Sequence, residues 1–304
     1  MIDPSDLDTV EFPLERDQDR ARPASSVVRV DVAAKSHPGH VRSSNEDHYL
    51  VAAAGRHLET LLSNLPEDEA PKRFDETSYI AIVADGMGGA VGGEIASRLA
   101  ITTLIDILSH VPDWILRLDE EHAQKVMDRA AEYYRKVNET IVEHARLKPE
   151  LRGMGTTMTG AYSYGDDLFV VHVGDSRAYL FREGVLRRLT QDHTHAQKLA
   201  DLGIIRPEAV ETHRLRHVLT NALGGEKSEG RAEIHRMRLC DGDRILLCSD
   251  GLHDMVDDEG IANVLKSHSR SEPACDALLK RALENGGKDN VTAVVAGYII
   301  PDGG

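Results

Sequence analysis

The fold class follows from the stretch Thr157-Met-Thr-Gly-Ala-Tyr-Ser-Tyr-Gly-Asp-Asp-Leu-Phe-Val-Val-His-Val173, in which a short polar turn separates two apolar runs. The turn, Tyr164-Gly-Asp-Asp167, is too short for the crossover that parallel neighbours need, so an antiparallel hairpin is predicted. A second short turn, Arg182-Glu-Gly184, joins the next two apolar runs in the same way. Consecutive hairpins favour antiparallel sheets over a doubly wound parallel sheet.

The spacing of apolar residues predicts the other elements around this hairpin. The predicted strands are 28–32, 48–54, 79–84, 157–164, 168–173, 178–182, 185–189, 233–239, 244–248 and 291–298. The predicted helices are 94–109, 120–146, 196–202, 258–267 and 272–285. Runs of strands with helices in separate pairs indicate one α+β domain over residues 27–300.

Two regions lack this periodicity. Residues 1–26 carry seven acidic side chains and three prolines, which predicts a flexible acidic tail. Residues 55–77 are polar and contain two prolines, so a surface excursion with at most one helical turn is expected there.

The composition limits the partners and the compartment. A formal net charge of −15 argues against non-specific nucleic-acid binding and against an anionic membrane surface. The three cysteines form no CxxC pair, and there is neither a signal-peptide pattern nor an apolar run of about 20 residues. These features predict a cytoplasmic protein.

The glycine-rich stretch Val83-Ala-Asp-Gly-Met-Gly-Gly-Ala-Val-Gly-Gly-Glu94 suggests a phosphate-binding turn at first. A Walker loop needs a lysine after its glycines, and none follows here. Gly86, Gly88 and Gly92 give GxGxxxG, one residue longer than the dinucleotide pattern, although Asp106 follows at a suitable distance. A plain tight turn is the third alternative. The distinguishing residue is Asp85, which ends an apolar strand.

Acidic residues recur in this setting. Each lies at a predicted strand end beside Gly, Asn or Ser, and the set is Glu46, Asp47, Asp85, Asp175, Asp250 and Asp289. One such aspartate is more commonly a turn or cap residue, but together they form a set of hard oxygen ligands. With the accessible carbonyl of Gly86, the set predicts a magnesium or manganese site.

Six motifs in order carry a resemblance to a known family. They are Arg42-Ser-Ser-Asn-Glu-Asp47, Asp85-Gly-Met-Gly-Gly89, Gly155-Thr-Thr157, Gly174-Asp-Ser-Arg177, Ser249-Asp-Gly-Leu252 and Gly287-Lys-Asp-Asn-Val-Thr292. Over residues 27–300 the chain closely resembles the metal-dependent (type 2C) Ser/Thr protein phosphatases, and the bacterial branch most of all. The resemblance implies a β-sandwich of two antiparallel sheets flanked by pairs of helices.

The resemblance also implies roles for individual residues. Two Mn²⁺ or Mg²⁺ ions would lie among Asp47, Asp85, the Gly86 carbonyl, Asp250 and Asp289, with Asp85 bridging them. Glu46 would act through metal-bound water, and Asp175 with Asp250 would hold a third ion. Arg42 would bind the substrate phosphate, and residues 192–230, including Asp192 and His193, would form a mobile flap.

The implied activity is hydrolysis of phosphoserine and phosphothreonine on proteins that a cognate Ser/Thr kinase phosphorylates. A hydroxide bridging the two ions would attack phosphorus in line. Met87 stands where animal members carry a histidine, so the general acid is open between His193 and metal-bound water, and His193 could equally be a turn-capping residue. Asn221 replaces a frequent arginine of bacterial members.

Two other functions stay open at this point. One is a catalytically inactive phosphoprotein-binding module on the same fold, although no metal aspartate is missing. The other is a phosphatase dedicated to a small anti-sigma-pathway partner.

Overall fold

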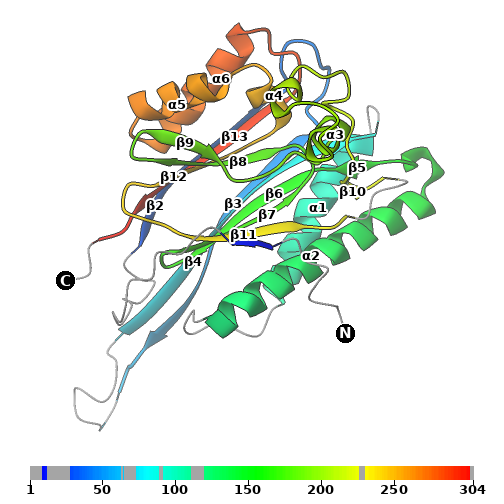
Figure 1. The fold of residues 1–304 in the computed structure, drawn as a ribbon. Coiled ribbons are helices and arrows are strands. Elements are labelled where there is room, and N and C mark those ends of the chain that lie inside the picture. The colour runs from blue at the N-terminus through cyan, green and yellow to red at the C-terminus, as the bar shows by residue number, and fades with distance from the viewer. Residues whose placement is uncertain are drawn as a thin grey trace.

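The computed structural model of the chain describes residues 9–11, 28–62, 64, 73–88, 92–110, 120–225 and 230–301. Two β-sheets pack face to face, and helices cover the outer face of each (Figure 1). The larger sheet has the order β1 (Thr9–Glu11), β11 (Glu233–Arg238), β7 (Asp167–Val173), β6 (Met158–Tyr164), β4 (Arg73–Met87), β5 (Gly155–Thr156) and β10 (Leu223–Gly224), with β3 (Asp47–Glu59) also paired to β4. The smaller sheet has the order β2 (Arg29–His37), β13 (Val291–Ile299), β12 (Arg244–Cys248), β8 (Arg177–Arg182) and β9 (Val185–Arg188).

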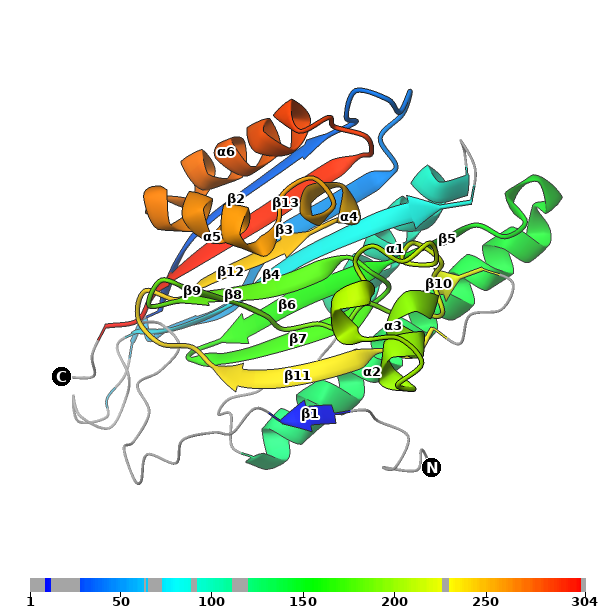
Figure 2. The ribbon, with the colours of Figure 1, turned by 45° about the horizontal axis from the view of Figure 1, so that its top comes forward.

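The helices form two groups on opposite sides of the sandwich (Figure 2). α1 (Gly92–Ser109) and α2 (Glu120–Leu147) cover the larger sheet, whereas α5 (Asp258–Ser267) and α6 (Ser271–Glu284) cover the smaller one. Four short segments complete the described helices: α3 (His195–Asp201), α4 (Asp250–His253) and the 3-10 turns at Pro149–Leu151 and Pro207–Ala209. None of the helices in the described ranges is long and apolar enough to cross a bilayer.

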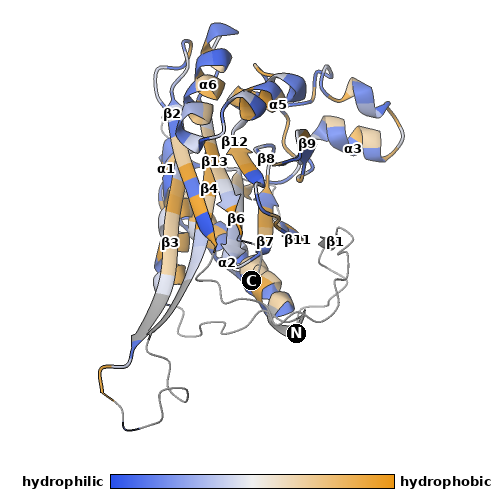
Figure 3. Ribbon diagram, turned by 90° about the vertical axis from the view of Figure 1, so that its left-hand side faces the viewer, coloured by the Kyte–Doolittle hydropathy of each residue, from blue (hydrophilic) through white to orange (hydrophobic). Residues whose placement is uncertain are grey.

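Three apolar layers hold this arrangement together, because each sheet is apolar on both faces. Side chains such as Val83, Val170 and Leu247 fill the space between the sheets. Ile82 and Val171 point to the opposite face of the larger sheet and pack under α1 and α2. Figure 3 shows hydrophobic residues running along strands of both sheets. Burial of this apolar area is the main stabilising contribution to the fold.

The predicted fold class is confirmed, and the structure has two mainly antiparallel sheets with helices on each outer face. The hairpin at 164–167 joins β6 and β7 in antiparallel register, with Tyr164 opposite Asp167. Short turns make this outcome predictable from local sequence alone.

The expectation for residues 55–77 was wrong in part. β3 continues to Glu59 and β4 begins at Arg73, and the two strands pair throughout, with Gly55 opposite Thr77. They form a long hairpin that extends beyond the sandwich (Figure 1). Polar residues in a two-stranded ribbon give no alternation of apolar and polar positions, which is the signal a strand prediction needs. Residues 63 and 65–72 lie outside the described residues.

Part of the predicted tail forms a strand. β1 pairs in parallel with β11 at the edge of the larger sheet, with Val10 opposite His235 (Figure 2). The other residues of 1–26 lie outside the described residues. A strand of three residues that pairs far along the chain leaves no periodic pattern in the sequence.

Candidate metal centre

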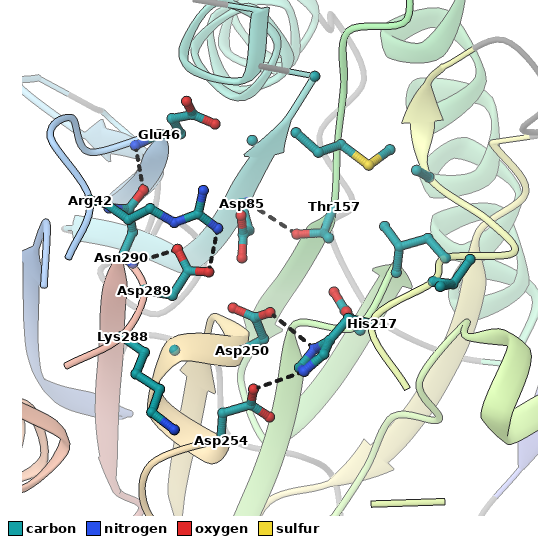
Figure 4. A pocket seen from close by; sticks show the side chains of 18 of the residues that line it. Arg42, Glu46, Asp85, Thr157, His217, Asp250, Asp254, Lys288, Asp289 and Asn290 are labelled. Atoms are coloured by element: carbon teal, nitrogen blue, oxygen red, sulfur yellow. Dashed lines mark hydrogen bonds and ion pairs between the residues drawn. The ribbon is translucent and has the colours of Figure 1, made fainter. Parts of the chain in front are cut away.

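Every predicted ligand except Asp47 lines a cavity of about 1070 Å³ at one end of the sandwich, and Asp47 is buried directly opposite Asp85. Both sheets contribute to it: Asp85 comes from β4 of the larger sheet, Asp250 follows β12 of the smaller sheet, and Asp289 precedes β13. Their carboxylates face one another across the cavity, with the Arg42 guanidinium beside them (Figure 4). The sequence motifs therefore meet in space although Arg42 and Asp289 lie 247 positions apart in the chain.

Asp85 lies two residues before the end of β4 and is held through its backbone. Its N–H donates to Thr157 Oγ1 (3.0 Å), and its carbonyl accepts from the Thr156 hydroxyl (2.8 Å) and the Thr157 N–H (2.9 Å). This is what the Gly155-Thr-Thr157 motif does, a role that the sequence alone left unassigned. Because its backbone is fixed on three sides, the carboxylate of Asp85 has a fixed position.

Asp47 and Asp85 form a pair at directly opposite positions of β3 and β4. Like charges opposite each other in a sheet repel, so this register is unfavourable unless a cation lies nearby. Asp47 Oδ2 accepts from the hydroxyls of Ser249 and Thr292, both at 2.7 Å. Asp47 Oδ1 is buried and has no hydrogen-bond partner in the described part of the chain. A buried carboxylate oxygen without a donor fits a metal ligand.

The pKa values of the cluster show the same need for a cation. Burial, opposed in part by the two hydroxyl hydrogen bonds, raises the pKa of Asp47 to about 6. Burial and the neighbouring acids raise the pKa values of Asp85 and Asp250 well above the usual range for aspartate. Burial and the charge of Asp192 raise the pKa of Asp175 to about 7. A divalent cation would favour the ionised carboxylates, and an all-oxygen donor set fits Mn²⁺ or Mg²⁺.

Two glycines bring helix α1 against the site. A Cβ atom on Gly86 would lie 2.1 Å from the carbonyl oxygen of Gly93, and one on Gly93 would lie 2.2 Å from Glu46 Oε2. The backbones of β4 and α1 therefore approach more closely than any side chain would allow. This approach leaves the Gly86 carbonyl beside the Glu46 carboxylate.

We expect Gly86→Ala to lower the free energy of unfolding by about 2 kcal/mol or more, since the new methyl group meets backbone that cannot move aside. Gly297→Ala is the matched control, because a Cβ added at Gly297 would lie 3.7 Å from its nearest neighbour, Ser271 Oγ. Chemical denaturation of both variants measures the effect. Equal stability of the two variants would contradict the close approach.

Glu46 is positioned by residues that the sequence analysis did not single out. Its N–H donates to Asn290 Oδ1 (2.8 Å), and its carbonyl accepts from the Ser97 hydroxyl (2.6 Å). Asn290 Nδ2 also donates to the carbonyls of Pro38 and Ser44. The asparagine beside Asp289 thus fixes the loop that carries Arg42 and Glu46.

Arg42 reaches the cavity from this loop. Its Nη2 donates to Asp289 Oδ2 at 2.7 Å, and this hydrogen bond raises the pKa of the guanidinium. The Arg42 side chain is 56% exposed, so it is accessible to an incoming anion. A planar guanidinium binds two phosphate oxygens at once.

The two predicted flap residues lie outside the cavity lining in the described structure. Asp192 is buried in a bidentate ion pair with Arg177, with Nη2 2.6 Å from Oδ2. His193 Nδ1 accepts from the Gly174 N–H (3.1 Å), and its Nε2 lies 3.3 Å from Glu233. Both side chains hold the chain that follows β9 to the sandwich.

The structure also brings His217 and Asp254 into the cavity, and no motif pointed to either. His217 Nδ1 lies 3.8 Å from Asp250 Oδ2, and its Nε2 lies 3.4 Å from Asp254 Oδ2 (Figure 4). A lone histidine in an irregular segment carries no local signal, because its partners come from a distant helix.

The fold is a β-sandwich in which carboxylates from both sheets converge on one cavity. The sequence profile described as "Protein phosphatase 2C" matches residues 63–295, and the chain belongs to the protein phosphatase 2C family. The predicted family is confirmed by this match and by the named relatives.

Two curated relatives and one solved structure show the extent of the similarity. "Serine/threonine protein phosphatase PstP" of Mycobacterium tuberculosis is 36% identical over 272 residues, which cover 90% of this chain and 46% of PstP. The chain thus spans about half the length of that relative. "Serine/threonine phosphatase stp" of Listeria monocytogenes is 34% identical over 71% of this chain and 83% of its own. The catalytic domain of PstP in complex with two manganese ions superposes with a TM-score of 0.69 at 33% identity, over 90% of this chain and 99% of that domain.

Proposed function

We propose that the chain hydrolyses phosphoserine and phosphothreonine on proteins with two Mn²⁺ or Mg²⁺ ions. The observation that carries this proposal is the opposed pair Asp47 and Asp85, with the buried and unpartnered Asp47 Oδ1. The manganese complex of the PstP catalytic domain supports it independently. An inactive binding module would be favoured by the loss of one of the predicted metal-binding acids, and none of them is missing from this sequence.

The residues proposed to hold the two ions are Asp47, Asp85, the Gly86 carbonyl, Asp250 and Asp289, with Asp85 shared and Glu46 acting through water. When bound, the ions supply Lewis acidity and lower the pKa of water toward neutrality, so that hydroxide is available for in-line attack. Asp175 with Asp250 would serve a third ion.

The other side chains bind and orient the substrate. Arg42 lies beside the ligand cluster and would bind the equatorial phosphate oxygens as charge develops on them. Met87 lines the cavity, but its side chain has no proton to donate. His193 does not line the cavity, and its Nε2 faces Glu233. Water in the cavity is therefore the proposed proton donor to the leaving oxygen.

Arg42→Ala is expected to lower kcat/KM for a phosphothreonine peptide about 100-fold, chiefly because phosphate oxygens lose a bidentate donor. Product inhibition by inorganic phosphate should weaken in parallel. Arg42→Lys, which keeps the charge without the planar fork, should recover only part of the loss. If Arg42→Ala left both KM and the inhibition by inorganic phosphate unchanged, Arg42 would have no part in binding the substrate.

Phosphate release from a phosphothreonine peptide, measured with and without Mn²⁺, tests the proposed activity directly. We expect turnover that requires the metal and is lost in Asp250→Asn. Tight peptide binding without turnover, under saturating Mn²⁺, would instead favour the inactive module.

The proposed cellular setting rests on composition. The physiological substrates would be targets of a cognate Ser/Thr kinase, acting in the cytoplasm, where Cys240, Cys248 and Cys275 would stay reduced. The net charge of −15 supports neither nucleic acid nor an anionic membrane as a partner. We also propose that residues 27–300 form a single phosphatase domain whose flap spans 192–230.

A further inference from the structure

We propose that Lys288 forms a second anion subsite in the cavity, which selects substrates with another anionic group close to the phosphorylated residue. This inference rests on the proposed function, since it names a class of substrate for the same cavity. The anionic group belongs to the substrate itself, and it is either the carboxylate of an acidic side chain or a second phosphate.

Lys288 differs from the two arginines that line the cavity, because its charge has no partner. Arg42 Nη2 lies 2.7 Å from Asp289 Oδ2. In the same way, Arg216 Nη2 lies 3.2 Å from Asp254 Oδ2. The ammonium group of Lys288 makes neither an ion pair nor a hydrogen bond with any residue in the described ranges, and the residue is exposed. It is therefore available to an anion that enters the cavity.

The Lys288 side chain is directed away from the proposed phosphate site (Figure 4). Arg42 lies beside Asp289, whereas Lys288 extends from the neighbouring backbone toward the Asp254 side of the cavity. Arg42 is thus placed for the reacting phosphate, and Lys288 for a different part of the substrate. The cavity of about 1070 Å³ has room for both, since pockets of about 300 to 1,000 Å³ hold a whole drug-sized ligand.

The loop that carries Lys288 is held on both sides. The carbonyl of Gly287 accepts from the His40 N–H at 2.7 Å. On the other side, Asn290 Nδ2 donates to the Ser44 carbonyl at 2.8 Å. The backbone at Lys288 is therefore fixed, and only its flexible stem has to be ordered when an anion binds.

The charge of the metal-loaded cavity favours an anion at this place. The two divalent ions of the proposed function would neutralise the four aspartates proposed to hold them. Asp254, the acid on the Lys288 side, already accepts a hydrogen bond from Arg216. The unpaired ammonium group then dominates the field on this side, and complementary charge of this kind contributes chiefly to specificity.

Turnover of a set of phosphothreonine peptides by the full chain at saturating Mn²⁺ tests the proposal. A single glutamate is placed in turn at each of the three positions on either side of the phosphothreonine, and glutamine replaces it in the reference peptides. At one position we expect kcat/KM to be about three- to fivefold higher with glutamate, the size of one exposed ion pair. A phosphonate analogue of phosphoserine at that position, which cannot be hydrolysed, separates a second phosphate from a carboxylate.

Two variants connect this preference to Lys288. Lys288→Gln should abolish the difference between the glutamate and glutamine peptides. Lys288→Glu should invert it, so that a peptide with lysine at the same position becomes the better substrate. Both peptides are measured on the same variant, so their ratio does not depend on how much of the protein is folded.

Lys266→Glu is the matched control. Lys266 is an exposed lysine on α5 that does not line the cavity, and its substitution changes the net charge as Lys288→Glu does. The control should keep the wild-type preference for glutamate. Added salt should reduce that preference in both proteins, because it screens exposed charges.

The results separate this proposal from the proposed function. Equal turnover of glutamate and glutamine peptides at every position, with no gain from the phosphonate, would overturn the subsite. A preference that persists in Lys288→Gln would overturn the role of Lys288, and so would an equal loss on all peptides, which would place Lys288 at the reacting phosphate. A gain from the phosphonate alone would support the subsite and identify a second phosphate as its ligand. If the wild type hydrolysed none of the peptides, the proposed function would fail, and this subsite with it.

Discussion

Asp85→Asn is expected to reduce turnover of a phosphothreonine peptide by about three orders of magnitude at saturating Mn²⁺. The substitution keeps the shape of the side chain but removes the charge that both core ions would share. The backbone contacts to Thr156 and Thr157 do not involve the carboxylate, so the fold should be retained.

Asp106→Asn is the matched control for this experiment. Asp106 is an exposed acid on α1 and its side chain is 77% exposed, so turnover should change by less than about twofold. Initial rates of phosphate release and circular dichroism of both variants measure activity and fold. If Asp85→Asn turned over the peptide as fast as the wild type, Asp85 would not be a ligand of the proposed metal centre. Asp289→Asn should also lose most of the activity.

The same Asp85→Asn substitution is expected to stabilise the metal-free protein, by about 1 to 3 kcal/mol at pH 8. In the metal-free state Asp47 and Asp85 are buried at opposite positions, and their raised pKa values report an unfavourable ionised form. Removing one charge relieves the repulsion. Thermal unfolding after treatment with a chelator measures the gain.

The stability of the metal-free protein should fall as the pH rises, and the gain from Asp85→Asn should rise with it. The folded pKa values of Asp47 (about 6) and Asp175 (about 7) lie above the ordinary 3.8, so the folded state binds more protons between these limits. The contribution of these groups to stability is therefore full at low pH and is lost as pH rises through 6 to 7. The advantage of Asp85→Asn over the wild type should be larger at pH 8 than at pH 5.

Mn²⁺ should reverse the order, because binding to the native state stabilises the wild type and the variant lacks a ligand. Wild-type protein with Mn²⁺ should then unfold at a higher temperature than Asp85→Asn with Mn²⁺. If Asp85→Asn were less stable than the wild type without metal at pH 8, the cluster would not be electrostatically strained.

Local patterns predicted most of the fold. The β6–β7 hairpin and the helices α1, α5 and α6 follow from turn length and apolar spacing, both of which act over a few residues. Elements without such a pattern were missed. β1, β5 and β10 are two or three residues long, and the outer part of β3 and β4 is polar, so only pairing with a distant strand reveals them.

The candidate site divides in the same way. The acids were found because each combines an apolar strand end with a small or polar neighbour, and that combination is visible in sequence. Asn290, Ser97 and Thr157 position those acids through side-chain hydrogen bonds. His217 was missed because its partners, Asp250 and Asp254, lie 33 and 37 residues further along the chain.

The sequence by itself determined the α+β class, the hairpins and the chemical type of the ligands, because turn length, periodicity and side-chain chemistry are local properties. Only the tertiary structure decided that Asp47 lies opposite Asp85, that Arg42 contacts Asp289 and that His217 lies beside Asp250. These placements depend on strand register and on how the segment that carries His217 packs against the sandwich. Both are set by the burial of the whole core, to which residues far apart in the chain contribute together.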